Sequence, residues 1–238
     1  ISGKYDILHR NTPYSAFVQA LDQLADLILA ESEATVSKWR NSILDGVGPL
    51  AKIIIDLNHK WERILGNLEE LPGLTGKEWK NRLHFVLGNL FKIIASEEHP
   101  VILFLDDCQW ADDASIELLS KITANDEIKF YLTVVAYRQN EVGKTHLLSK
   151  FFEEIENYRQ APEHSISEIQ LNKITTEDCT KIINVILRNP IHDLEDFSAL
   201  IFGKTEGNPF LINQLLDLLY QKRLLLLNLE SVSMPPPL

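Results

Sequence analysis

Cysteine, long apolar runs and runs of positive charge are all scarce in this sequence. The two cysteines, Cys108 and Cys179, cannot build a disulfide framework, and neither belongs to a CxxC pair that would predict a zinc site. The longest purely apolar stretches, such as Val101–Leu105 and Leu224–Leu227, are far shorter than the ~20 residues of a membrane-spanning helix. No run of five lysines or arginines occurs, and the net charge is −11, which argues against a broad nucleic-acid surface. We therefore expect a protein of the reducing cytoplasm that binds neither nucleic acid nor membrane.

The two ends of the sequence also lack familiar features. It begins with Ile1 rather than methionine and shows no signal-peptide pattern. It ends in Met234–Leu238, a proline-rich stretch that fits neither a helix nor a strand. We expect residues 226–238 to be a truncated or irregular tail, and both ends to be cut from a larger protein.

Hydrophobic patterning divides the chain into parts of different character. Residues 12–96 read as helices, beginning with Thr12-Pro13 as N-cap and first helical position and continuing with an apolar stripe from Phe17 to Ile28. Short continuous apolar runs then predict strands that are buried on both faces of a parallel sheet. These strands are expected at 101–105, 130–137 and 166–171.

The last part of the chain is predicted to be helical. Thr175 to Asp178 resembles a capping box, Gly203 is placed as a C-terminal helix cap, and Asn208-Pro209 is a helix start. Strands that alternate with helices indicate an α/β protein with a parallel sheet. We therefore expect a sheet-containing core over residues 1–172 and a helical subdomain over 173–225.

The strongest chemical signal is the run Val101–Leu105 followed by Asp106 and Asp107. It matches the Walker B pattern of P-loop ATPases, in which a buried strand delivers a carboxylate to the ligand-binding edge of the sheet. Mg²⁺ prefers oxygen ligands and keeps several waters, so one fixed carboxylate suffices to hold it. Asp106 is then the metal residue, and Asp107 orients the attacking water. The alternative interpretation is a strand that simply ends in a polar turn.

Further stretches extend this signal into a family resemblance. Residues 103–112 read LFLDDCQWAD, which resembles the signature of AAA-type ATPase domains of the STAND-like signal-transduction class. The chain is most similar to the predicted ATPase module of multidomain protein kinases and hybrid histidine kinases. The other matching stretches are Ile1–Asn11, Tyr14–Phe17, Ala136–Glu141 and Gly207–Phe210. The resemblance spans about residues 1–225 and implies a P-loop ATPase core with a C-terminal helical subdomain.

The resemblance also implies roles for residues outside the Walker B motif. Arg138 lies where the family has a sensor residue for the terminal phosphate, and an arginine suits this because its planar fork pairs with phosphate oxygens. Gly207, Asn208 and Pro209 look like the GxP element that lies near the nucleotide base. The alternatives are an ordinary surface arginine and, for Asn208-Pro209, a helix start without a ligand.

The acidic residues allow two other interpretations. Asp106, Asp107, Asp112 and Asp113 could form a magnesium cluster of the isoprenoid-synthase kind, but such clusters lie on long helices and VILFL is short and poorly periodic. At least one of Asp112 and Asp113 is expected to cap the helix that begins near Ala114. Cys108 is expected to be a packed thiol.

The phosphate-binding Walker A motif, GxxxxGK[ST], does not occur in the sequence. Gly143-Lys144-Thr145 and Gly203-Lys204-Thr205 resemble its end, but Arg138 and Ser198 stand where the first glycine is required. Both also follow the Walker B motif, against the order in this superfamily. The expectation is that the chain starts just downstream of the phosphate loop and lacks the first strand of the core.

From these observations we expect the chain to be a fragment of an ATP-dependent regulatory switch, with Mg²⁺ as the metal. The partners are expected to be other domains of the same polypeptide, a kinase or histidine kinase, with self-association as a further possibility. ATP hydrolysis is expected of the full-length parent and not of this fragment. Two alternatives remain: a degenerate ATPase fold that scaffolds protein partners, and a helical interaction domain with a chance LDD motif.

Overall fold

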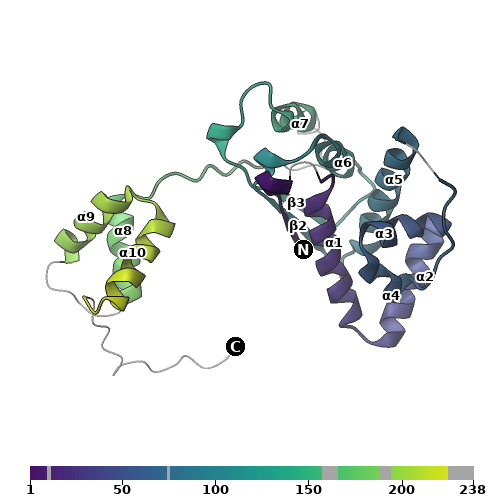
Figure 1. The fold of residues 1–238 in the computed structure, drawn as a ribbon, viewed down its shortest axis with the longest axis horizontal. Coiled ribbons are helices and arrows are strands. Elements are labelled where there is room, and N and C mark those ends of the chain that lie inside the picture. The colour runs from purple at the N-terminus through teal and green to yellow at the C-terminus, as the bar shows by residue number, and fades with distance from the viewer. Residues whose placement is uncertain (10–11, 74–75, 157–165, 188–193, 225–238) are drawn as a thin grey trace. The chain divides into compact units, whose positions relative to one another are not determined.

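The structure is a computed structural model, and it divides into two compact units, Ile1–Ile166 and Ser167–Leu238 (Figure 1). The residues that it describes are 1–9, 12–73, 76–156, 166–187 and 194–224. The tail expected at residues 226–238 lies outside them. None of the described helices combines the length and the apolar character needed to cross a bilayer.

The first unit is built on a three-stranded parallel sheet. Its strands are β1 (Ser2–Lys4), β2 (Val101–Asp106) and β3 (Tyr131–Val135), in the order β1-β2-β3. All three run in the same direction, so their carboxyl ends lie at one edge of the sheet. The α/β fold class with a parallel sheet, predicted from alternating strand and helix patterns, is confirmed.

The strand expected at residues 166–171 does not form. This segment has no regular secondary structure, and the side chains of Ile169 and Leu171 are 84% and 91% exposed. Strand propensity expresses packing against neighbouring strands more than an intrinsic backbone preference. Among the described residues, β3 pairs with β2 alone, so the segment lacks the partner that its apolar run requires.

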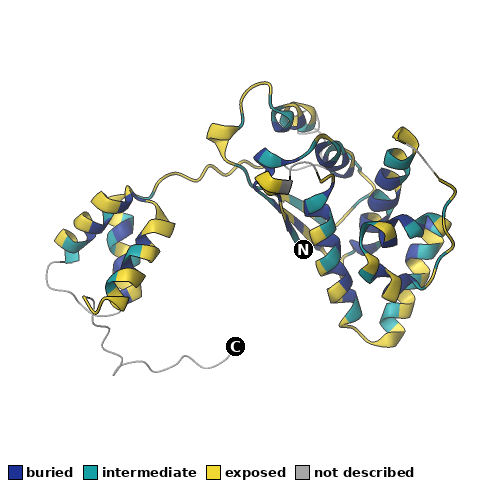
Figure 2. Cartoon of the chain, viewed as in Figure 1, coloured by how far each residue is buried: buried dark blue, intermediate teal, exposed yellow. Residues whose placement is uncertain are grey.

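The helices of the first unit pack against the sheet and against one another, and together they form one hydrophobic core. The buried residues lie on the inward-facing sides of these helices (Figure 2). On one face of β2, Leu103 and Leu105 are inaccessible to solvent. Phe91 from the longest helix contacts the ring of Tyr131 on β3 at 5.3 Å between centroids. The α-helices are α1 (Ser15–Leu29), α2 (Glu33–Val47), α3 (Lys52–Leu57), α4 (Glu62–Leu65), α5 (Lys77–Ile94), α6 (Asp113–Thr123) and α7 (Leu147–Glu156). Short 3₁₀ turns are Ile7–His9, Gly48–Ala51, His59–Trp61, Cys108–Trp110 and Gln139–Glu141.

The opposite face of the sheet is apolar and open within the described part of the chain. Ile102 and Leu132 are 53% and 52% exposed, and Phe104 and Val134 lie beside them on the same face. Burial on both faces was expected for these strands, and the structure corrects that to one face. The continuous apolar run is still what a strand covered on both sides would need.

Helix α1 begins at Ser15 and not at the predicted Thr12-Pro13 start. Tyr14 is the N-cap residue, in a left-handed conformation with φ 62° and without a side-chain cap. Its backbone N–H instead donates to Asp112 Oδ2 and Ser115 Oγ of the α6 region. These tertiary hydrogen bonds fix the start of the helix, and a local capping rule has no access to them.

The outer edge of β1 is covered by two glutamine side chains of α1. Gln19 accepts a hydrogen bond from Lys4 N–H (2.9 Å) and donates one to Lys4 C=O (3.0 Å). Gln23 makes the same pair with Ser2, at 2.8 and 3.0 Å. Four residues of helix rise ~6 Å and two residues of strand ~6.6 Å, so the two repeats match. The close approach needs Gly3, since a Cβ there would lie 1.9 Å from the Ala16 carbonyl oxygen.

The second unit contains three helices, α8 (Thr176–Leu187), α9 (Leu194–Thr205) and α10 (Pro209–Gln221). Thr175 and Asp178 form the predicted reciprocal cap, in which each side chain accepts the other residue's N–H. Gly203 lies inside α9, so its predicted role as a helix cap is wrong. The left-handed position that ends this helix is taken by Glu206 and Gly207 instead. The core of the second unit is formed by side chains from all three helices, namely Cys179, Ile183, Leu187, Ile201, Ile212 and Leu216.

Candidate functional site

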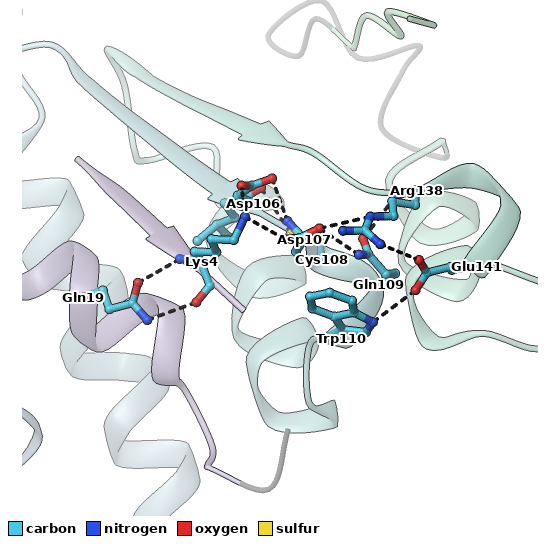
Figure 3. A network of polar contacts seen from close by, with 10 residues as sticks. Lys4, Gln19, Asp106, Asp107, Cys108, Gln109, Trp110, Arg138 and Glu141 are labelled. Carbon is cyan, nitrogen blue, oxygen red and sulfur yellow. Dashed lines mark hydrogen bonds and ion pairs between the residues drawn. The ribbon is translucent and has the colours of Figure 1, made fainter. Parts of the chain in front are cut away.

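A network of charged and polar residues lies at the carboxyl edge of the sheet (Figure 3). Asp106 ends β2 and Asp107 follows it, while Arg138 lies just beyond β3. Lys4 ends β1 and is in register with Asp106. The sheet therefore brings together the three site residues predicted from the sequence for this unit, and it adds a lysine that was not predicted.

The two acids differ in environment because the backbone turns sharply between them. Asp107 has a left-handed conformation with φ 51°, which asparagine and aspartate tolerate better than most residues. Its N–H donates to Asp106 Oδ1 at 2.8 Å. The side chain of Asp106 stays 37% exposed, whereas that of Asp107 is 10% exposed. The outer acid is thus open to a ligand, and the inner one is set into the protein.

Lys4 bridges the two carboxylates. Its Nζ lies 2.8 Å from Asp106 Oδ2 and 2.7 Å from Asp107 Oδ2. Hydrogen bonds to Asp106 and then to Asp107 raise the pKa of Lys4 far above its usual range. The same contact, followed by the hydrogen bond from Gln109 and the nearby Arg138, lowers the pKa of Asp107. A cation is therefore held between the acids that the sequence assigned to metal binding and catalysis.

Gln109 connects the end of β2 to the end of β3. Its Nε2 donates to Asp107 Oδ1 at 2.9 Å, and its Oε1 accepts the backbone N–H of Arg138 at 3.1 Å. The side chain is buried, and its backbone carbonyl contacts His146 Nε2 at 3.0 Å. Gln109 thus fixes the spacing between the inner acid and the start of the segment that carries Arg138.

Arg138 is held against the rest of the site by three groups. Its guanidinium carbon lies 5.0 Å from the centroid of the Trp110 ring, and its Nη1 donates to Glu141 Oε1 at 3.0 Å. Its Nε lies 3.5 Å from Asp107 Oδ1. Trp110 Nε1 donates to the other oxygen of Glu141 at 3.1 Å, which closes the network. The arginine is half exposed and faces solvent at the same edge as Asp106.

Sequence reasoning missed Lys4, Gln109 and Glu141 as members of this site. Each lies in a stretch used for the family resemblance, namely residues 1–11, 103–112 and 136–141. Their side-chain partners come from other strands or turns, so the strand register had to be known before they could be assigned. Cys108 is buried as predicted, its Sγ contacts the Leu105 carbonyl at 3.3 Å, and burial raises its pKa to about 12.

The residues present fit a single divalent cation held mainly through water and ligand oxygens. No group of three or more His, Cys, Asp or Glu side chains with metal-site geometry occurs among the described residues. Mg²⁺ needs only one or two protein carboxylates when phosphate and water complete its octahedron. The Lys4 ammonium lies between Asp106 and Asp107 and contacts one oxygen of each.

Other predicted positions have clear structural roles. Asp112 is the N-cap of α6 and accepts the Ser115 N–H at 2.9 Å, as expected for one of the two acids there. Gly143-Lys144-Thr145 lies in the connection between β3 and α7, after the 3₁₀ turn Gln139–Glu141. Gly203-Lys204-Thr205 lies within α9 and therefore forms no loop.

Gly207, Asn208 and Pro209 belong to the second unit. Asn208 caps α10, with its side chain accepting the N–H groups of Phe210 and Leu211, and Pro209 is the first helical residue. Gly207 has φ 72°, and a Cβ there would lie 2.5 Å from the Ile174 carbonyl oxygen. The helix-start interpretation is confirmed, and contact with a nucleotide base stays a prediction.

Comparison with known proteins identifies the family. The AAA ATPase domain family matches residues 1–135, which is more than half of the chain. The chain is also 33% identical over 119 residues to hybrid signal transduction histidine kinase G of Dictyostelium discoideum. That match covers 50% of this chain and 3% of the much longer kinase. No solved structure matches significantly. The chain therefore belongs to the AAA ATPase domain family.

Proposed function

We propose that this chain supplies the metal and phosphate-sensing residues of an ATP-dependent regulatory switch within a larger signalling protein. One observation carries the proposal: Asp106, Asp107 and Arg138 meet at the carboxyl edge of a parallel sheet, in a member of an ATPase family. Open α/β sheets bind their ligands at this edge.

The environments of the three residues favour distinct roles. Asp106 is the exposed acid, with one oxygen fixed by a backbone N–H, and would hold Mg²⁺ through its water shell. Asp107 is the inner acid and would orient the attacking water. Arg138 would pair with the terminal phosphate. ATP with Mg²⁺ supplies the phosphoryl group and the negative charge that these side chains recognise.

We further propose that a phosphate-binding loop from another segment completes the site. The sequence contains no GxxxxGK[ST] motif, and the apolar face formed by Ile102, Phe104, Leu132 and Val134 is open in the described structure. A helix that carries the loop would cover such a face, and the strand before it would pair with the edge of β3 that the described strands leave free. Hydrolysis then belongs to the assembled parent and not to this chain alone. Gly207 to Pro209 are proposed to contact the nucleotide base.

The proposed setting is the cytoplasm, with the other domains of the same polypeptide as partners. The printed name of the Dictyostelium relative, a hybrid histidine kinase, supports a kinase or histidine kinase among them. Self-association through the open sheet face is a further possibility. We propose no nucleic-acid or membrane partner.

The test compares this chain with a longer parent polypeptide that carries a phosphate loop. Calorimetry with ATP and Mg²⁺ is expected to give very weak binding to the chain alone and measurable binding to the parent. In the parent, Asp106→Ala should weaken the magnesium-dependent binding, and Asp107→Asn should spare binding but slow hydrolysis. Asp113→Asn is the matched control, because Asp113 belongs to the same acidic stretch and is exposed in α6.

Equal and small effects of Asp106→Ala and Asp107→Asn would contradict the proposal and favour a strand that ends in a polar turn. A micromolar dissociation constant for the isolated chain would place the phosphate site elsewhere.

A degenerate ATPase fold that scaffolds partners is the second candidate function. It is favoured by the engagement of both Asp107 oxygens, one by Lys4 and the other by Gln109 and Arg138. An acid so occupied is not free to orient water. A parent that binds its partner domains equally well with and without ATP would support this candidate.

A further inference from the structure

We propose that the Lys4 ammonium group is an internal counter-ion in the divalent-cation position between Asp106 and Asp107, and that a divalent cation binds there only by displacing it. The inference rests on the proposed assignment of Asp106 to the metal and adds a residue that controls access to it. If Lys4 competes in this way, the metal affinity of the site depends on a residue of β1 as well as on the acids of the Walker B strand β2.

The geometry leaves room for one cation only. Lys4 Nζ makes contacts of 2.8 and 2.7 Å to Oδ2 of Asp106 and of Asp107. Asp106 Oδ1 already accepts a backbone N–H, and Asp107 Oδ1 faces Gln109 and Arg138. The ammonium therefore covers both Oδ2 atoms, and the one on Asp106 is the oxygen that the water shell of a divalent cation would need. A metal ion placed there would be within a few ångströms of a like charge, which is unfavourable.

The backbone of Lys4 is held firmly, whereas its side chain is free to leave. Gln19 makes two hydrogen bonds to the Lys4 peptide groups, and the neighbouring Tyr5 N–H donates to Asp106 C=O. Gly3 locks the strand against α1. The Lys4 side chain is 60% exposed, so its flexible stem can rotate the ammonium group into solvent. Displacement thus requires a side-chain movement and leaves the sheet intact.

The charge balance explains how displacement would be coupled to phosphate. The acids Asp106, Asp107 and Glu141 face the cations Lys4 and Arg138, so the network carries one net negative charge. This is a weak attraction for a bare divalent cation. Polyphosphate would bring the negative charge that both a metal ion and a released lysine require, so metal and nucleotide are expected to bind together.

A second lysine offers a matched control. Lys60 bridges Asp22 and Asp26 on α1, with both Nζ–oxygen distances at 2.8 Å. The geometry matches that of Lys4, but the bridge lies on a helix surface and not at the carboxyl edge of the sheet. Removing Lys60 therefore frees two carboxylates without touching the proposed site.

The experiment measures Mn²⁺ binding to the whole 238-residue chain by the electron paramagnetic resonance signal of free Mn²⁺. Lys4→Gln is expected to bind Mn²⁺ roughly tenfold more tightly than the wild type, because a competing positive charge is gone. Lys60→Gln is expected to leave this affinity unchanged. In the double variant Lys4→Gln/Asp106→Asn the gain should disappear. Circular dichroism of each variant checks the fold.

A folded Lys4→Gln variant without a gain overturns the inference. If Asp106→Asn alone still weakens Mn²⁺ binding, the assignment of Asp106 survives. A gain that persists in the double variant places the metal elsewhere and overturns both.

A measurement on the wild type keeps the inference falsifiable if Lys4→Gln does not fold. Amine labelling read by mass spectrometry should show faster modification of Lys4, and not of Lys60, over the Mn²⁺ range in which the chain binds metal. Constant labelling of Lys4 over that range overturns the inference.

Discussion

Asp106 and Asp107 were predicted from the acids at the end of a recognisable apolar strand, and Arg138 from its position after the next strand together with the family resemblance. Their joint position at the sheet edge follows from parallel pairing alone. The residues that set their charge state and orientation, Lys4 and Gln109, could not be found this way. Their contacts depend on register and on the left-handed turn at Asp107, which no local pattern specifies.

His84 is a buried histidine whose charge the fold opposes. It is 6% exposed, its Nε2 contacts the Tyr14 hydroxyl at 3.1 Å, and its Nδ1 has no hydrogen-bond partner. Glu117 lies 3.8 Å from Nδ1 but is paired with Lys80 and Lys121. Burial, followed by the charge of Lys121, lowers the pKa of His84 to about 4.

The unfolded chain therefore takes up this proton at a higher pH than the folded chain. Stability should fall as the pH drops from about 6.5 towards about 4, since protons then bind the unfolded state preferentially. Thermal melts over this range should show a flatter dependence for His84→Gln, which retains a hydrogen-bonding group, than for the wild type. The exposed His59 provides the control His59→Gln, and equal slopes for both variants would refute the assignment.

Asp112 has a structural task that its neighbour Asp113 lacks. Its carboxylate accepts the N–H and hydroxyl of Ser115 and the N–H of Tyr14, so it joins the starts of α6 and α1. Asp112→Ala should lower the free energy of unfolding by about 1–2 kcal/mol, the range for a lost N-cap. Urea denaturation should show a much smaller change for Asp113→Ala. Equal effects would mean that neither the cap of α6 nor the link to α1 contributes to stability.

At the scale of elements, sequence patterns correctly predicted the strands and helix caps that depend on local residues. They failed where contacts with another element determine the structure. The β2 strand and the caps of α8 and α10 followed from local residues. The expected strand at 166–171 lacks a pairing partner, and the start of α1 is set by hydrogen bonds that the Tyr14 N–H donates to Asp112 and Ser115. In both cases tertiary contacts decide the outcome, by their absence at 166–171 and by their presence at Tyr14.

The glutamine cover of β1 is an element-scale feature with a measurable strength. Gln19→Ala removes two hydrogen bonds to the Lys4 backbone, each with a net value of about 0.5–1.5 kcal/mol. Water replaces them in part because the edge becomes accessible. We expect a lower melting temperature of the variant. We also expect faster exchange of the Lys4 amide proton, which hydrogen–deuterium exchange measures.

Gln19→Glu is an informative comparison for that variant. A carboxylate still accepts the Lys4 N–H but cannot donate to the Lys4 carbonyl. The melting temperature of Gln19→Glu should lie between those of the wild type and Gln19→Ala. A Glu variant as stable as the wild type would show that the donated bond is without value.

At the scale of the whole molecule, the open sheet face predicts self-association of the isolated chain. Ile102 and Leu132 place large apolar side chains side by side on exposed strands, a surface that associates readily. Ile102→Thr/Leu132→Thr keeps strand-forming residues and should reduce the apparent mass in sedimentation experiments at micromolar concentration.

The control variant is Ile169→Thr/Leu171→Thr, which removes exposed apolar groups outside the sheet. It should leave the apparent mass unchanged. If both double variants reduce association equally, general surface apolarity and not the sheet face is responsible.

The glutamine cover of β1 also determines at which edge a further strand can join the sheet. Gln19 and Gln23 are hydrogen-bonded to the outward-facing backbone groups of β1, so an added strand would find no donors or acceptors on that side. The strand order leaves the far side of β3 as the place for an addition among the described elements. Any polypeptide that extends this sheet, whether a remote part of the same chain or another molecule, must therefore lie along Tyr131–Val135. There it would run next to the strand that leads to Arg138, with β3 and β2 between it and Lys4 on β1.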